Sequence, residues 1–137
     1  MTDMPPREAS RIHLEHNDDL IRVRASVRDA ASEMGFTHTD QVRIVTATSE
    51  LARNIMRYAG SGYVEIARVK QRGERGLRIR FEDCGPGIKD IALAMTDGYT
   101  TSRGLGKGLP GARRLVDEFV IESEVGKGTT IIITKWL

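Results

Sequence analysis

The spacing of apolar residues along the chain predicts two consecutive helices in its first half. Apolar residues recur every three or four positions over residues 17–34 and again over residues 39–58, the period of a helix with one buried face. A glycine closely follows each run, as is common after a helix C-terminus. Val42 and Val45 belong to a wide apolar stripe of the second helix, so we expect that helix to pack against a sheet. The candidate N-cap residues are Asn17 or Asp18 for the first helix and Thr39 or Asp40 for the second.

Strand patterns surround these helices. Before them, Ile12 and Leu14 alternate with polar residues and predict a short first strand. After them, alternating segments separated by glycine-containing turns predict two hairpins. These comprise residues 63–69 and 77–81 around a turn at 71–76, and residues 119–124 and 129–136 around a turn at 125–128. Between the hairpins we expect one more helix, which begins at Pro110 and ends near residue 118.

This order of elements predicts a single α/β domain. We expect a two-layer sandwich in which the helices cover one face of a mixed, mostly antiparallel sheet. The domain should comprise residues 10–137, after a disordered leader over residues 1–9 in which Pro5 and Pro6 block regular structure. A chain of 137 residues buries enough surface to fold without a disulfide or a structural metal.

Composition narrows the possible classes of function. The chain has 21 Lys and Arg against 19 Asp and Glu, a net charge of +2, which argues against a nucleic-acid binder held by bulk charge. Its one cysteine excludes an internal disulfide and a cysteine-based zinc cluster. The sequence has neither an 18-residue apolar run nor a secretory signal, so we expect a cytoplasmic protein without a membrane segment.

Glu50 and Asn54 form the first pair of candidate chemical groups. They are four residues apart on the second predicted helix and therefore project from the same face. A carboxylate can deprotonate a hydroxyl nucleophile, and an amide oxygen can bind Mg²⁺. The alternative is a solvated helix face on which Glu50 pairs with Arg53 or Arg57.

A glycine-rich turn directly follows the strand predicted over residues 77–81. Asp83 can accept a hydrogen bond from an exocyclic amine such as that of adenine, whereas guanine carries an acceptor at the same ring position. Gly85 and Gly87 permit close approach of the backbone. The alternative is a tight turn that the aspartate side chain caps.

A second glycine-rich segment, residues 104–110, leads into the third predicted helix. Its glycine backbone and the helix N-terminus present N–H donors to phosphates, and Lys107 adds a positive charge. The polar residues 96–103 before it suit a mobile lid. The segment matches neither the Rossmann fingerprint nor a Walker loop, and its alternative is a flexible surface loop. A last turn at 126–128, followed by Thr129, indicates by itself an ordinary hairpin.

Taken in order, these four motifs resemble the Bergerat-fold ATP-binding superfamily, which includes gyrase, Hsp90, histidine kinases and MutL. The motifs are Glu-x-x-x-Asn on a helix, Asp-x-Gly-x-Gly, Gly-x-Gly-x-Gly and Gly-x-Gly-Thr. Within the superfamily, four stretches resemble the RsbT-type switch-protein serine kinases of the bacterial stressosome. They read DQVRIVTATSELARNIMRYAG, EDCGPGI, DGYTTSRGLGKGLPGARRLVDEF and ITKWL.

The resemblance implies a role for each matched residue. Asn54 would bind the Mg²⁺ that bridges the ATP phosphates, and Glu50 would be the general base for the incoming serine hydroxyl. Asp83 would contact adenine, with Thr129 supporting that end of the site. The glycines that would shape the pocket and its lid are Gly85, Gly87, Gly104, Gly106 and Gly108. Phosphate contacts from Arg103 and Lys107, which occupy variable positions of the lid motif, are our own inference.

The resemblance also implies a serine/threonine-protein kinase that uses ATP and Mg²⁺. Its substrates would be STAS-domain proteins of the RsbS and RsbR kind, and the released kinase would activate an RsbU-like phosphatase. One alternative is an anti-sigma-factor kinase, whose helix motif usually ends in His-Gly where this chain has Arg57-Tyr58-Ala59-Gly60. The other is a nucleotide-dependent interaction module, which would not need a general base.

Overall fold

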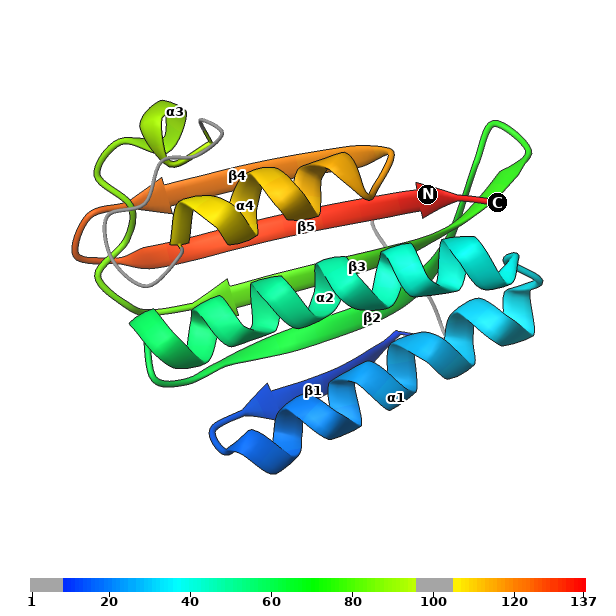
Figure 1. Ribbon diagram of the computed structural model, residues 1–137, viewed down its shortest axis with the longest axis horizontal. Coiled ribbons are helices and arrows are strands. Elements are labelled where there is room, and N and C mark those ends of the chain that lie inside the picture. Colours follow the sequence, from blue (N-terminus) through cyan, green and yellow to red (C-terminus); the bar gives the residue numbers. More distant parts are fainter. Residues whose placement is uncertain (1–8, 96–104) are drawn as a thin grey trace.

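The computed structural model describes residues 9–95 and 105–137, with the side chains of the second range from residue 108 onward. Its elements are β1 (Ser10–Leu14), α1 (Asn17–Met34), α2 (His38–Tyr58), β2 (Gly62–Gln71), β3 (Glu74–Asp83), α3 (Ile91–Ala94), α4 (Leu105–Arg114), β4 (Glu118–Glu124) and β5 (Gly128–Trp136). The strands form one sheet in the order β1-β2-β3-β5-β4, in which all described pairings are antiparallel. α1, α2 and α4 lie on the same face of this sheet (Figure 1). The predicted two-layer α/β sandwich is confirmed.

α1 has its predicted bounds, but its cap differs from the prediction. His16 takes the N-cap position, and Asp19 Oδ2 accepts the backbone N–H groups of Glu15 and His16, each at 2.9 Å. Asn17 and Asp18, predicted as caps, are exposed residues of the first turn. Asp19 is the third residue of the helix, the position from which a carboxylate reaches back to the N-cap backbone.

α2 begins one residue earlier than predicted and ends where predicted. Its N-cap is Thr37, whose Oγ1 accepts the backbone N–H of Asp40 at 3.1 Å. The predicted caps Thr39 and Asp40 therefore lie inside the first turn. Val42, predicted to belong to the buried stripe, is 50% exposed, because the face that packs on the sheet starts at Ile44.

The first hairpin has longer strands and a shorter turn than its sequence pattern indicates. β2 and β3 pair in continuous register as far as Gln71 and Glu74. The turn consists of Arg72 and Gly73 alone, at φ values of 53° and 83°, and does not extend over residues 71–76. Residues 70–75 at this end of the hairpin are exposed, so they need no apolar alternation to form strands.

The prediction for the third helix is wrong in its bounds. α4 comprises Leu105–Arg114, whereas the sequence pattern placed a helix over residues 110–118. Most of the glycine-rich segment expected as a loop is therefore helical, with Pro110 inside the helix. Leu109 and Ala112 are fully buried, and this packing outweighs the low helix propensity of glycine and proline. The four-residue helix α3 was not predicted either.

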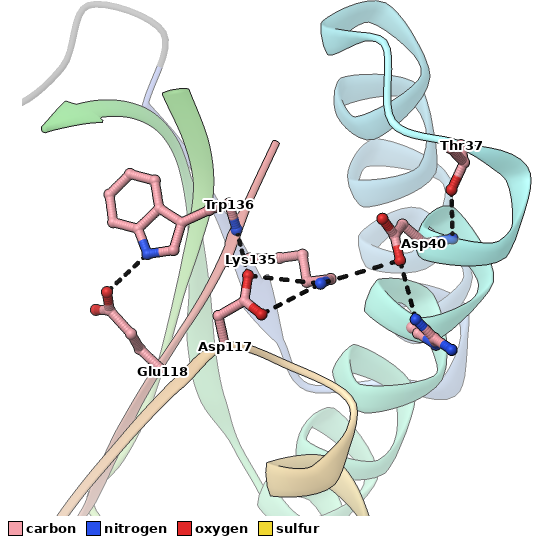
Figure 2. Close-up of polar contacts among 7 residues, drawn as sticks. Thr37, Asp40, Asp117, Glu118, Lys135 and Trp136 are labelled. Atoms are coloured by element: carbon pink, nitrogen blue, oxygen red, sulfur yellow. Dashed lines mark hydrogen bonds and ion pairs between the residues drawn. The ribbon is translucent and has the colours of Figure 1, made fainter. Parts of the chain in front are cut away.

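The core lies between the sheet and the helices, and α2 runs along the middle of the helical layer (Figure 1). At the end of the sheet near the start of α2, four residues form what we call the far-end cluster: Asp40, Asp117, Lys135 and Trp136 (Figure 2). The opposite end, near the C-terminus of α2, contains the pocket described next. Within residues 9–95 and 105–137, no helix is long and apolar enough to cross a bilayer.

Candidate active site

A narrow pocket of about 90 Å³ lies between the C-terminal half of α2, the end of β3, the start of β5 and α4. Largely apolar walls with a few polar groups suit a flat aromatic ring. The apolar walls come from Leu51, Ile55, Phe81, Ile88, Leu109 and Ile131. The predicted site residues that line the pocket are Asn54, Asp83, Gly87 and Thr129. Segments that are far apart in the sequence therefore meet here.

Asn54 is buried at its amide nitrogen and has no hydrogen-bond partner there among the described residues. It lies directly against α4, because a Cβ added to Gly108 would come within 3.0 Å of Nδ2 and 3.5 Å of Oδ1. An unpaired buried donor costs about 1–3 kcal/mol, a cost that a ligand acceptor would remove. Its Oδ1 is an oxygen donor of the kind that Mg²⁺ takes beside nucleotide phosphates. Asn54 therefore fits the metal-binding role that the sequence predicts.

The Asp83 carboxylate is held in place by backbone N–H groups. Oδ1 accepts from Gly85 at 2.8 Å, and the backbone N–H of Thr129 also donates to the carboxylate. Burial raises the pKa of Asp83 above its ordinary value of 3.8, the two N–H groups oppose this rise, and the charge of Glu82 adds to it. The ionised carboxylate can only accept hydrogen bonds, so this end of the pocket favours a ligand group that donates.

Gly87 connects the pocket to the β4–β5 turn. Its φ is +80°, and an added Cβ would lie 2.3 Å from the carbonyl oxygen of Glu124. Beside it, the Gly126 backbone N–H donates to the Pro86 carbonyl at 2.9 Å. Only glycine permits so close a contact at this φ. The predicted close approach at Gly87 therefore brings the loop after β3 against the turn before β5.

Glu50 lies one turn before Asn54 on α2, outside the wall of the pocket. Its Oε1 is 3.2 Å from Arg53 Nη1, and its side chain is 42% exposed. The ion pair that the sequence offered as an alternative is therefore present. An exposed pair of this kind is worth less than about 1 kcal/mol, so it opens readily and leaves the carboxylate available as a base.

Four predicted lid residues fall partly or wholly beyond what the structure describes. Arg103 and Gly104 lie outside the described residues. Gly106 and Lys107 belong to the first turn of α4, and only their backbone is described. The phosphate contacts of Arg103 and Lys107 therefore stay predictions.

Sequence reasoning missed Ser123, which lies on β4 beside Thr129 of β5. Its Oγ accepts the backbone N–H of Ile88 at 2.7 Å and lies 2.8 Å from Thr129 Oγ1. The alternation of β4 carries a signal for it, because Phe119, Ile121 and Ser123 share the partly buried face of that strand. A serine at the last inward-facing position of a strand, just before the Gly-x-Gly-Thr motif, is the sequence signal that could have indicated Ser123.

The chain matches the family model described as histidine kinase-, DNA gyrase B-, and HSP90-like ATPase over residues 39–137. It is also 54% identical over 119 residues to the serine/threonine-protein kinase RsbT of Bacillus subtilis (strain 168), across 87% of this chain and 90% of that protein. An anti-sigma F factor of Geobacillus stearothermophilus is 31% identical over 119 residues, across 82% of this chain and 80% of that protein.

Solved structures share the fold at lower identity. The RsbU and RsbW domains of a Mycobacterium tuberculosis protein match 92% of this chain with a TM-score of 0.61 and 24% identity. A histidine kinase domain from Erythrobacter litoralis matches 86% of this chain with a TM-score of 0.53 and 21% identity. This chain spans 32% of the first structure and 59% of the second, so both likenesses concern the fold alone.

Proposed function

Because the chain belongs to the histidine kinase-, DNA gyrase B-, and HSP90-like ATPase family, and within it to the RsbT-type serine/threonine-protein kinases, we propose that it phosphorylates STAS-domain proteins of the RsbS and RsbR kind. Kinase activity and the use of ATP in partner-switching stress signalling follow from that membership. The STAS-domain substrate and the use of Mg²⁺ are our proposals. The substrate class rests on the similarity to RsbT, and the use of ATP with Mg²⁺ at this site rests on one observation: Asn54, Asp83 and Thr129, from three separate segments, line a single pocket.

The pocket has two ends with different chemistry: a base end that would bind adenine and a phosphate end that would bind the ATP phosphates. At the base end, Asp83 accepts from the adenine amine, and Thr129 lies beside it. At the phosphate end, the Asn54 amide nitrogen donates to a phosphate oxygen, and its oxygen would hold Mg²⁺. When bound, this ion offsets charge on the phosphates.

Glu50 supplies the proton acceptor for the transfer. The serine hydroxyl oxygen of the substrate attacks the γ-phosphorus while the bond from that phosphorus to the β,γ-bridging oxygen breaks, and Glu50 takes the hydroxyl proton. Its exposure on α2 leaves it accessible to the side chain of another protein, since the carboxylate lies outside the pocket wall.

Phosphate transfer to a purified STAS-domain partner tests the proposal. With radiolabelled ATP and Mg²⁺, the wild-type protein should label a serine or threonine, and Glu50→Gln should lower the initial rate by about 10²-fold or more. Arg43→Gln is the matched control, because it removes an exposed ion pair of the same spacing from the same helix, and it should keep the wild-type rate. Absence of transfer by wild-type protein that binds ATP would contradict the proposal.

We further propose that the kinase, once released from its substrate, activates an RsbU-like phosphatase, as its similarity to RsbT favours. Adding the purified chain to such a phosphatase should raise the rate of phosphate release, and prior addition of unphosphorylated STAS-domain partner should suppress that rise. An unchanged phosphatase rate would remove this partner from the proposal.

The anti-sigma-factor kinase is the second candidate, because an anti-sigma F factor is 31% identical to this chain. Such a protein would form an ATP-dependent complex with a sigma factor. Comparing the affinity of the chain for a sigma factor with its affinity for a STAS-domain protein and an RsbU-like phosphatase separates the two. Tighter binding to the sigma factor would favour the second candidate.

A further inference from the structure

Ser123 makes three polar contacts at the base end of the pocket. Its Oγ accepts the backbone N–H of Ile88 at 2.7 Å, lies 3.0 Å from the carbonyl oxygen of Gly128, and lies 2.8 Å from Thr129 Oγ1. The hydroxyl is partly buried, and no catalytic role requires it. It does, however, decide which way the hydrogens around Thr129 point.

Counting donors and acceptors leaves one arrangement that satisfies all three contacts. A serine hydroxyl has one hydrogen to donate and two lone pairs. The carbonyl of Gly128 can only accept, so Ser123 must donate to it. Thr129 must then donate its own hydrogen to Ser123, whose two lone pairs receive Thr129 and the Ile88 N–H.

In this arrangement Thr129 turns only lone pairs toward the pocket. Thr129 and Asp83 are paired residues of neighbouring strands, and both line the pocket. The base end then presents two acceptors and no side-chain donor from this pair. An exocyclic amine has two hydrogens to offer such a pair, whereas a carbonyl oxygen at the same ring position meets only acceptors.

We propose that Ser123 is a specificity-determining positioning residue, which selects adenine over guanine nucleotides by fixing Thr129 as a hydrogen-bond acceptor. This inference deepens the proposed function and rests on it. Without the Ser123 hydroxyl, Thr129 Oγ1 loses its acceptor and is free to donate its hydrogen to a ligand. A 6-oxo group then gains a donor, and the preference for the amine falls.

The ratio of ATP affinity to GTP affinity, measured by calorimetry with Mg²⁺, tests the proposal. Ser123→Ala should lower this ratio by about tenfold, the value of one redirected hydrogen bond. Ser123→Thr, which restores a hydroxyl with a strand-compatible side chain, should recover the wild-type ratio. Thr130→Ala removes a hydroxyl from the next residue of β5, on the other face of the sheet, and should not change the ratio.

The Thr129→Val variant separates a role of Ser123 in positioning the Thr129 hydroxyl from a role in packing alone. In Thr129→Val the hydroxyl is absent, so adding Ser123→Ala should no longer change the ATP to GTP ratio. If Ser123→Ala weakened the binding of ATP and of GTP equally, and so left the ratio of their affinities unchanged, Ser123 would be structural and the inference would be overturned. Failure of the wild-type chain to bind ATP would instead remove the proposed function itself.

Discussion

The role proposed for Asn54 in binding ATP and Mg²⁺ comes with little benefit to stability. Its buried amide nitrogen has no partner among the described residues, so truncating it removes no intramolecular hydrogen bond at that atom. We expect Asn54→Ala to keep the free energy of unfolding within about 1 kcal/mol of the wild-type value. We expect the same change to lower the rate of phosphoryl transfer by about 10²-fold or more, because in the proposed site the phosphates would lose a donor and Mg²⁺ would lose a ligand. Urea unfolding and the transfer assay measure the two quantities.

Thr46→Ala is the matched control for this prediction. Thr46 is an exposed residue two turns earlier on α2, so its truncation should change neither the unfolding free energy nor the transfer rate appreciably. A variant Asn54→Ala that unfolds much more easily but still transfers phosphate would show that Asn54 is structural.

Among individual residues, the sequence indicated candidate site residues where the chemistry of the side chain is distinctive. Asn54 and Asp83 could be selected because an amide and a carboxylate at motif spacing indicate a metal and an amine, and the structure places both in the wall of one pocket. Ser123 was missed because its importance depends on the register that places it opposite Thr129. Serine is common in strands and turns, and no local pattern says which backbone groups its hydroxyl will meet.

Two glycines of α4, Gly108 and Gly111, differ in the space available for a side chain. A Cβ at Gly108 would meet the Asn54 amide at 3.0 Å, whereas a Cβ at Gly111 would meet nothing within 4 Å. We expect Gly108→Ala to weaken binding of Mg²⁺ and ATP by about three- to tenfold, because the amide must move by a few tenths of an ångström. Isothermal titration calorimetry measures this change.

Gly111→Ala is the control and should act in the opposite sense on stability. Alanine is the better helix former by about 1 kcal/mol, and the space at this position is open, so the free energy of unfolding should rise. ATP affinity should stay at the wild-type value. Equal nucleotide affinities for the two variants would mean that α4 does not approach Asn54 in the ATP-binding form.

The start of α1 carries a prediction about pH. The backbone N–H groups of Glu15 and His16, with the nearby Arg22 guanidinium, hold the pKa of Asp19 below its ordinary value of 3.8. The folded state therefore favours the ionised carboxylate. Its contribution to stability is fully present above the unfolded-state pKa and is lost as the pH falls through the lower folded-state pKa.

We therefore expect Asp19→Asn to lower the thermal unfolding midpoint at neutral pH, and this difference from wild type to shrink below pH 3.8. Asp18→Asn, an exposed neighbour in the same first turn, should have a smaller effect. Thermal unfolding followed by circular dichroism from about pH 3 to about pH 7 measures the difference. A difference that does not change with pH would show that the Asp19 charge is not what stabilises the turn.

Helices and strands were predictable where a single face is buried along their length. α1 and α2 satisfy that condition, and so do the inner parts of β2 and β3, whereas the exposed residues 71–75 of this hairpin were predicted as part of its turn. α4 was misplaced because four of its ten residues are glycine or proline, and local preference argued against a helix. Its helical form depends on contact with α2, which no local pattern reveals.

Across the whole molecule, the pocket and the far-end cluster lie at opposite ends of the helical layer. The pocket lies near the C-terminus of α2, while the far-end cluster joins the first turn of α2 to β5 and to Asp117, the residue just before β4 (Figure 2). Lys135 Nζ is 3.2 Å from Asp117 and 3.9 Å from Asp40, and the Trp136 backbone N–H donates to Asp117 at 2.7 Å. The fourteen helical steps from Asp40 to Asn54 span about 21 Å.

This separation predicts that damage to the far-end cluster affects stability and leaves nucleotide binding intact. Lys135→Met keeps the aliphatic stem but leaves Asp117 and Asp40 without the ammonium, and the side chain is only 15% exposed. We expect a loss of about 1–2 kcal/mol in the free energy of unfolding, more than an exposed pair contributes.

Arg43→Met removes the exposed partner of Asp40 and should cost less than about 0.5 kcal/mol, so comparison of the two variants isolates the effect of the partly buried Lys135. The ATP affinity of Lys135→Met and of Arg43→Met, measured where both proteins are folded, should equal the wild-type value. The effects of Lys135→Met and Asn54→Ala on the free energy of unfolding should add, because sites so far apart share no partner. A loss of ATP affinity in Lys135→Met would mean that α2 transmits strain between its two ends. Equal losses in the free energy of unfolding for Lys135→Met and Arg43→Met would mean that Lys135 stabilises the fold no more than a surface charge does.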